Sequence, residues 1–126
     1  MKRTLELTKE LGVAAGAHPS YPDPANYGRV ELEIAVDELE ASLRKQIAAL
    51  ARAADKLGVR LNHVKPHGAV YHAANRHHEI ALAIGRAVMA GDSNLTRSVY
   101  PAGVFSHQVR SGNVKAGTCR DNTSNA

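Results

Sequence analysis

The feature that most constrains the fold is an alternation of helical and strand-like segments along the chain. Leucine, isoleucine and alanine recur at spacings of three and four, which predicts amphipathic helices over residues 2–11, 37–57, 69–74 and 79–89. Two short apolar runs, 13–17 and 59–64, separate the first three of these segments and are typical of strands covered on both faces. Helices that alternate with strands predict the α/β class, with a parallel sheet or barrel.

Glycine and aspartate mark the ends of the predicted helices. Gly12 follows the first helix and Gly58 follows the second, at positions where a left-handed glycine commonly ends a helix. Asp37 stands at the start of the second helix, either as its N-cap or as an acid in its first turn. These signals agree with the hydrophobic spacing.

Each predicted strand leads into a loop that contains histidine. Residues 18–28 hold three prolines together with Asp, Asn and Gly, a composition typical of a loop. The second loop is Lys65-Pro66-His67-Gly68. Because ligands of parallel α/β folds bind at the loops after the carboxyl ends of strands, the two loops predict the site.

The second loop groups an amine between two imidazoles. Pro66 favours an extended Lys65, and an extended backbone points residues two apart to the same side, so His63, Lys65 and His67 are expected on one face. This set suits an anionic or carbonyl substrate, or a metal held by His63 and His67 beside a charge that polarises the substrate. The alternative is an exposed loop end that binds nothing.

The first loop offers a histidine directly after the strand and further polar groups. His18 is followed by Ser20, Tyr21 and Asp23. Polar side chains in the loop directly after such a strand commonly contact a ligand. In the alternative interpretation Ser20 and Asp23 cap turns while His18 bonds to nearby backbone. Arg29 either binds an anion or ends the loop as a solvated charge.

Charge and hydropathy argue against nucleic-acid and membrane functions. The net charge is +4, but residues 1–94 hold 12 Lys/Arg against 11 Asp/Glu, and the four basic residues of 95–126 form no cluster that would follow phosphates. No apolar run approaches the roughly 20 residues of a membrane-spanning helix, and no signal peptide is evident. The single Cys119 cannot form an internal disulfide, so we expect a cytoplasmic protein.

Residues 95–126 differ from the rest of the chain. They are rich in Ser, Gly, Asn and Thr, and their apolar residues follow no helical or strand period. We expect one domain over 1–94, followed by an irregular tail that is disordered or comes from an altered reading frame.

Four segments together identify a family. They are Gly-Ala-His-Pro-Ser-Tyr-Pro-Asp at 16–23, Tyr-Gly-Arg at 27–29, Gln-Ile-Ala-Ala-Leu at 46–50 and His-Val-Lys-Pro-His-Gly-Ala-Val-Tyr at 63–71. In residues, order and spacing they resemble the family of 5-oxoprolinase A subunits, also called the LamB/YcsF family. The similarity extends from about Leu5 to about Asn94.

The resemblance implies a barrel-like α/β fold of the glycoside hydrolase and deacetylase type. It also implies two partner subunits, B and C. Subunits A, B and C together open the lactam 5-oxoproline to L-glutamate with ATP and a divalent cation. Carried over by position, the catalytic residues are His18, Lys65 and His67, and the substrate-binding residues are His63, Asp23 and Arg29.

The sequence departs from the family at both ends. Family members begin with a strand bearing an Asp-Leu-Asn-x-Asp motif and one ending in Gly-Phe-His-Ala-Gly, and neither motif occurs here. We therefore expect a shortened, partial barrel whose open sheet edges favour homo-oligomers or low stability, with no catalysis by the chain alone.

Two other functions stay open at this stage. One is a metal-dependent carbohydrate deacetylase with His63 and His67 as ligands and Asp23 as base, although a third ligand is not evident. The other is a non-catalytic binding remnant. The sequence lacks the phosphate-binding loop Gly-x-x-x-x-Gly-Lys-Ser/Thr, so use of ATP requires another site or subunit.

Overall fold

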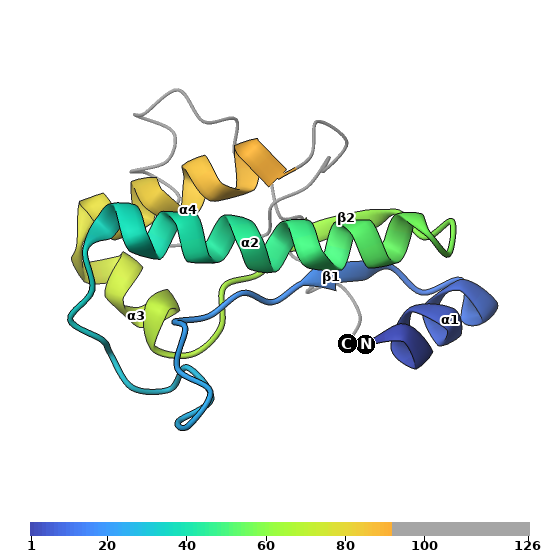
Figure 1. Cartoon of the computed structure of the whole chain (residues 1–126), viewed down its shortest axis with the longest axis horizontal. Helices are drawn as coiled ribbons and strands as arrows, with labels where there is room; N and C mark the ends of the chain where they lie inside the picture. Colours follow the sequence, from blue (N-terminus) through green and yellow to red (C-terminus); the bar gives the residue numbers. More distant parts are fainter. Residues whose placement is uncertain (92–126) are drawn as a thin grey trace, which may run out of the picture.

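The computed structural model describes residues 1–91 and confirms the α/β alternation (Figure 1). Its elements in chain order are α1 (Lys2–Leu11), β1 (Ala15–Ala17), α2 (Val36–Asp55), β2 (Leu61–Val64), α3 (Ala69–Arg76) and α4 (His78–Gly91). The predictions for residues 95–126 and for Cys119 lie outside the described residues. None of the helices described is both long and apolar enough to cross a membrane.

Both strands start two residues later than predicted, and the reason is the same for each. Gly12 and Gly58 adopt a left-handed backbone with φ of 65°. The amide of Val13 then bonds the carbonyl of Thr8 at 2.9 Å, and the amide of Val59 bonds that of Ala54 at 2.9 Å. This is the six-to-one hydrogen bond of a glycine-ended helix, and it commits each valine to the helix end instead of the strand.

The start of α2 also differs slightly from the prediction. The helix begins at Val36 with Ala35 as its N-cap, and no side chain caps it. Asp37 and Glu38 lie in the first turn, where their charge favours the positive end of the helix dipole. Of the two roles predicted for Asp37, the first-turn acid is therefore the correct one.

The two strands form a parallel sheet in which β1 pairs only with β2 among the described residues. Ala15 lies opposite Leu61 and Ala17 opposite Val64, with an irregularity in register after Ala15. Because the strands are parallel, their carboxyl ends point to the same side, toward α3 (Figure 1). The loops after the two strands therefore leave one end of the sheet.

Helix α2 runs over the sheet and contributes to both clusters of the core. Its buried residues recur at three and four positions and are Leu39, Leu43, Ile47, Ala51 and Ala54. The first three join a cluster with residues of α3 and α4, and the last two join a second cluster with β1 and β2. Helix α4 packs alongside α2 (Figure 1). One helix thus holds the sheet and the helices after it together.

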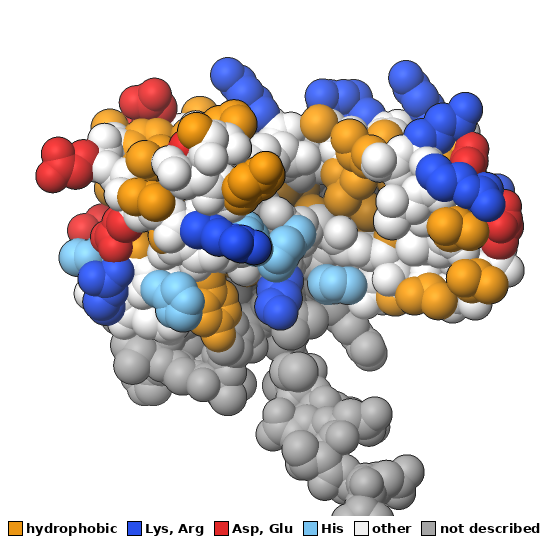
Figure 2. All heavy atoms as spheres, turned by 90° about the horizontal axis from the view of Figure 1, so that it is seen from below, with side chains coloured by type: hydrophobic (Ala, Val, Ile, Leu, Met, Phe, Trp, Pro, Cys, Tyr) orange, Lys and Arg blue, Asp and Glu red, His pale blue; other side chains and the backbone are white. Residues whose placement is uncertain are grey.

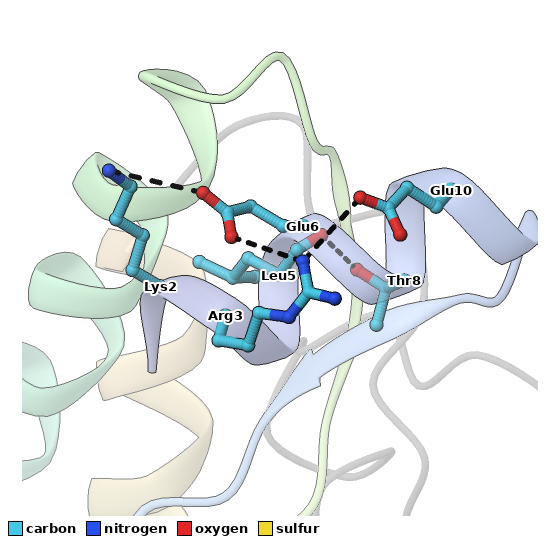
Figure 3. A network of polar contacts seen from close by, with 6 residues as sticks. All are labelled: Lys2, Arg3, Leu5, Glu6, Thr8 and Glu10. Atoms are coloured by element: carbon cyan, nitrogen blue, oxygen red, sulfur yellow. Dashed lines mark hydrogen bonds and ion pairs between the residues drawn. The ribbon is translucent and has the colours of Figure 1, made fainter.

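Helix α1 is attached through few contacts. Leu5 is its one buried residue. Exposed ion pairs join Arg3 to Glu6 at 3.7 Å and to Glu10 at 3.6 Å (Figure 3). These pairs join residues of the same helix and so do not attach it to the rest of the chain. The burial of Leu5 and the hydrogen bond from Nζ of Lys9 to the carbonyl of Leu57 at 2.8 Å attach it.

Candidate functional site

Backbone hydrogen bonds join the two histidine loops beyond the ends of the strands. The amide of Lys65 donates to the carbonyl of Ala17 at 2.9 Å, and the amide of His67 donates to that of Pro19 at 2.8 Å. These bonds continue the parallel pairing into the loops. The loops are therefore held at a fixed spacing by main-chain contacts.

The start of α3 is tied to the end of the first loop. The amide of Ala69 donates to the carbonyl of Gly28 at 3.0 Å. A side chain on Gly68 would lie 2.5 Å from that same oxygen, and Gly68 has a φ of 64°. Position 68 therefore requires glycine for both its backbone conformation and its space.

His18 and His67 contact each other across the two loops. Nδ1 of His18 lies 2.6 Å from the carbonyl oxygen of Lys65, and Nε2 of His18 lies 2.9 Å from Nδ1 of His67. The ring centroids are 4.6 Å apart, and the planes are inclined by 59°. The structure thus brings together two of the predicted catalytic residues, each from a different loop.

His63 lies over Gly16, its partner in the strand register. A Cβ atom at position 16 would be only 2.3 Å from Nε2 of His63, which is closer than any contact allows. The imidazole therefore occupies the space left by the missing side chain. No hydrogen bond within residues 1–91 joins His63 to Lys65 or His67, so the expected group of three is not linked in this way.

Lys65 is exposed, and its ammonium group forms no ion pair or hydrogen bond within the described residues. Figure 2 shows histidine side chains beside Lys and Arg side chains on one face of the molecule. An ammonium group without an internal acceptor can bind an anion or a carbonyl oxygen at little cost in lost contacts.

Asp23 and Arg29 are placed differently from the histidines. Asp23 shapes the turn after it, since its Oδ2 accepts a hydrogen bond from Nδ2 of Asn26 at 2.7 Å and its Oδ1 one from the amide of Asn26 at 3.3 Å. This is the turn-capping arrangement considered from the sequence. Arg29 is exposed, and within residues 1–91 its guanidinium has no hydrogen-bonded partner.

Gln46 is a residue of the site region whose role was not predicted from the sequence. This side chain of α2 accepts a hydrogen bond from the amide of Ser20 at 3.0 Å and donates one to the carbonyl of Ser20 at 2.8 Å. It therefore holds the first loop against α2 through both backbone groups of one residue. The signals in the sequence were its place in the family segment at 46–50 and its polarity next to Ile47 in the apolar stripe of the helix.

A shallow hollow of about 520 Å³ lies beside this contact. It is lined by the first loop, by Ser42 and Gln46 of α2, and by His67. Tyr27 at its edge has a φ of 54°, which is uncommon for a residue with a side chain, and is exposed. Outlying backbone at such a place is often found at functional sites.

Tyr21 belongs to the core and not to the exposed polar groups of the loop. Its side chain is 2% exposed and packs in the larger cluster. Burial raises the pKa of the Tyr21 phenol, the carboxylate of Glu31 raises this pKa further, and Arg76 opposes both. The sequence had suggested that this phenol meets a ligand, whereas its ring mainly anchors the loop.

The three other histidines within residues 1–91 lie at the surface. His72, His77 and His78 are exposed on or beside α3 and α4. Residues 1–91 contain no group of three or more His, Cys, Asp or Glu side chains able to hold a metal ion. The deacetylase alternative therefore gains no support from the part of the chain that the structure describes.

A parallel sheet whose carboxyl-end loops present histidines and a lysine defines an α/β protein with a candidate small-molecule site. The profile of the LamB/YcsF family matches residues 1–118, and the chain belongs to this family. The match continues beyond Asn94, where the residues alone had suggested that the similarity ends.

Two curated relatives carry the same name. The chain is 52% identical over 90 residues to the 5-oxoprolinase A subunit of Chloroflexus aggregans, an alignment that covers 71% of this chain and 36% of the relative. It is 42% identical over 106 residues to the 5-oxoprolinase A subunit of Thermus thermophilus, covering 84% and 42%. The chain thus spans less than half the length of these relatives.

A solved structure supports the same relationship. The crystal structure of a lactam utilization protein from Thermus thermophilus superposes with a TM-score of 0.83 and 39% sequence identity. The superposition covers 91% of this chain and 47% of that one. The two proteins are therefore similar in amino-acid sequence as well as in fold.

Proposed function

We propose that this chain acts as the A subunit of a 5-oxoprolinase, in the ATP-dependent opening of 5-oxoproline to L-glutamate. The names of the curated relatives and the description of the solved structure as a lactam utilization protein support a cyclic amide as substrate. Subunits B and C are the proposed partners, and a cytoplasmic location goes with this proposal. The short sheet is proposed to be part of a barrel-like fold.

The observation that carries the proposal is the meeting of the two loops at the carboxyl ends of the strands. Nε2 of His18 lies 2.9 Å from Nδ1 of His67, and Nδ1 of His18 lies 2.6 Å from the carbonyl oxygen of Lys65. In this proposal the lactam lies on these loops. The Lys65 ammonium binds its carboxylate or carbonyl oxygen, and the histidines serve as the nearby bases.

The chemistry explains why ATP is required. Resonance stabilises the lactam amide, so water attacks its carbonyl carbon slowly unless the oxygen is activated. Transfer of a phosphoryl group to that oxygen, with cationic stabilisation, provides this activation. We assign the binding of ATP and its divalent cation to the complete complex, because the sequence carries no phosphate-binding loop.

Binding of 5-oxoproline to the 126-residue chain tests the proposal directly. Calorimetric titration should show binding that Lys65→Ala weakens about tenfold or more, the loss of one charge-assisted contact. Lys45→Ala, on the exposed side of α2, is the matched control and should bind like the unaltered chain. Lack of binding by the unaltered chain, or unchanged binding by Lys65→Ala, would overturn the placement of the lactam.

Addition of subunits B and C tests the complete reaction. ATP-dependent release of glutamate from 5-oxoproline is the measurement, and Lys65→Ala should abolish it while Lys45→Ala retains it. Full turnover by Lys65→Ala would refute the role of this lysine even if binding of the lactam is confirmed.

A further inference from the structure

The carbonyl of Lys65 determines where the protons of the histidine pair lie. A carbonyl oxygen only accepts hydrogen bonds, so Nδ1 of His18, 2.6 Å away, carries a proton. In the neutral ring the other nitrogen, Nε2, is then an acceptor. Nδ1 of His67 lies 2.9 Å from that Nε2 and must be the donor.

One nitrogen of the pair is left without a hydrogen-bonded partner among residues 1–91. With Nδ1 of His67 protonated, Nε2 of the same ring carries a free lone pair. Its ring also lines the hollow beside Ser42 and Gln46. The chain of contacts therefore runs from the Lys65 carbonyl through His18 to a basic atom of His67, a residue that lines a hollow able to hold a ligand.

We propose that His18 and His67 form one unit that accepts a single proton at Nε2 of His67, with His18 as a positioning residue. A proton on Nε2 leaves the bond from Nδ1 of His67 to His18 intact, and neutral His18 stabilises the new imidazolium. A second proton, on His18, would place two N–H groups against each other and break the contact. Beyond the two Nδ1 protons, the geometry of the unit therefore accommodates one additional proton and not two.

The chemical role of this unit rests on the proposed function. In that reaction, His67 acts as the base that takes a proton from the attacking water. Water attacks the activated carbonyl carbon, a C–O bond forms, and one proton of the water moves to Nε2 of His67. The C–N bond then breaks as the hydroxyl of the adduct loses its proton and re-forms a carbonyl, and the lactam nitrogen leaves as an amine after taking the proton back from His67. The phosphoryl group remains on the acid as an acyl phosphate, which a second water hydrolyses to glutamate and inorganic phosphate. A base oriented by a third group is the usual arrangement for such transfers.

The main chain holds both rings in the required places. The amide of His67 is bonded to the carbonyl of Pro19, and the amide of Lys65 to that of Ala17. Gln46 fixes Ser20, two residues after His18. Neither loop can shift without losing several of these bonds, so the order of donors and acceptors is built into the fold.

The proton positions can be measured without any activity. Long-range proton–nitrogen NMR of the 126-residue chain, labelled with 15N-histidine, reports which ring nitrogen carries the proton. We expect both His18 and His67 in the Nδ1–H form at alkaline pH, although free histidine favours Nε2–H. The Nε2–H form in either ring would overturn the proposal.

Two substitutions at position 18 separate positioning from folding. In His18→Asn the short amide can still donate to the Lys65 carbonyl but cannot reach His67, so His67 should change to the Nε2–H form. In His18→Gln the longer amide can accept from Nδ1 of His67, which should keep the Nδ1–H form. His72→Gln, at an exposed position of α3, should leave His67 unchanged.

Glutamate release in the complex with subunits B and C gives the second readout. His67→Gln should lower kcat at least about 100-fold, whereas His18→Asn should lower kcat with little change in KM, and His18→Gln should restore part of the loss. Equal kcat values for the two His18 variants would refute the positioning role. The NMR result stands separately, so failure of the lactam assignment and failure of the proton unit are distinguishable.

Discussion

The imidazole of His63 fills the space that a side chain at position 16 would need. The two residues are partners across the parallel strands, and a Cβ on Gly16 would fall 2.3 Å from Nε2 of His63. The presence of the histidine at the carboxyl end of β2 therefore depends on a glycine in β1.

Gly16→Ala should displace the His63 ring and destabilise the chain by about 1 to 3 kcal/mol, the usual cost of overpacking. The double variant Gly16→Ala with His63→Ala should recover much of the loss, because the colliding ring is gone. Urea unfolding of the two single variants and the double variant measures the coupling. If the two effects simply add, the contact does not carry the cost.

Gln46→Leu should destabilise the chain by about 1 to 3 kcal/mol, because it removes both side-chain partners of the Ser20 backbone. Gln46→Glu keeps an acceptor for the Ser20 amide but loses the donor to its carbonyl, so an intermediate loss is expected. Lys45→Leu, one position earlier and exposed, is the control. Equal unfolding free energies for Gln46→Leu and Lys45→Leu would show that the contact with Ser20 is unimportant.

Leu43→Ala should cost about 2 to 5 kcal/mol, because Leu43 is 1% exposed in the cluster that joins α2 to α4. Arg44→Ala removes one ion pair of Glu40, whose side chain is 13% exposed and keeps its second pair with Arg86, so the loss should be at most about 1 kcal/mol. Chemical denaturation of both variants gives the comparison. The reverse order would mean that α2 is held by its surface charges.

Tyr21 should make stability fall at alkaline pH. Burial raises the pKa of its phenol in the folded chain above the unfolded value of about 10. Above that pH the unfolded chain gives up the proton first, so stability is fully present below about pH 10 and is lost as the pH rises through the folded pKa.

Tyr21→Phe should therefore flatten the decline of the unfolding free energy above about pH 10. Tyr27→Phe, at an exposed residue, is the matched control and should leave the slope unchanged. Denaturant titrations at several alkaline pH values provide the measurement. Identical slopes for both variants would contradict the effect of Tyr21 burial.

The sequence was most informative about helices, because helix ends and apolar stripes are local properties. Gly12 and Gly58 adopt the left-handed turn after α1 and α2 as predicted, although α2 itself ends at Asp55 and not at Leu57. The starts of the strands were less accessible, since apolar Val13 and Val59 look like strand residues but donate their amides to the preceding helix. Hydrophobicity alone does not distinguish these two uses of valine.

The location of the candidate site could be predicted from the sequence, but the contacts between its residues could not. The histidines after the strands pointed to the carboxyl end of the sheet. That His18 contacts His67 rather than His63 depends on how the two loops pack, and the residues are 49 positions apart. The role of Gln46 likewise follows only from the placement of α2 beside the first loop.

The glycine turns that follow α1 and α2 determine the residue at which each strand begins. Leu-Gly-Val precedes each strand, at 11–13 before β1 and at 57–59 before β2, and each strand begins two residues after the valine. Since side chains alternate between faces, inserting a single residue between Val59 and Leu61 would turn His63 to the opposite side of the sheet, away from Gly16. The tripeptide Leu-Gly-Val at 57–59, which is remote from the chemistry, therefore determines on which face of the sheet His63 lies.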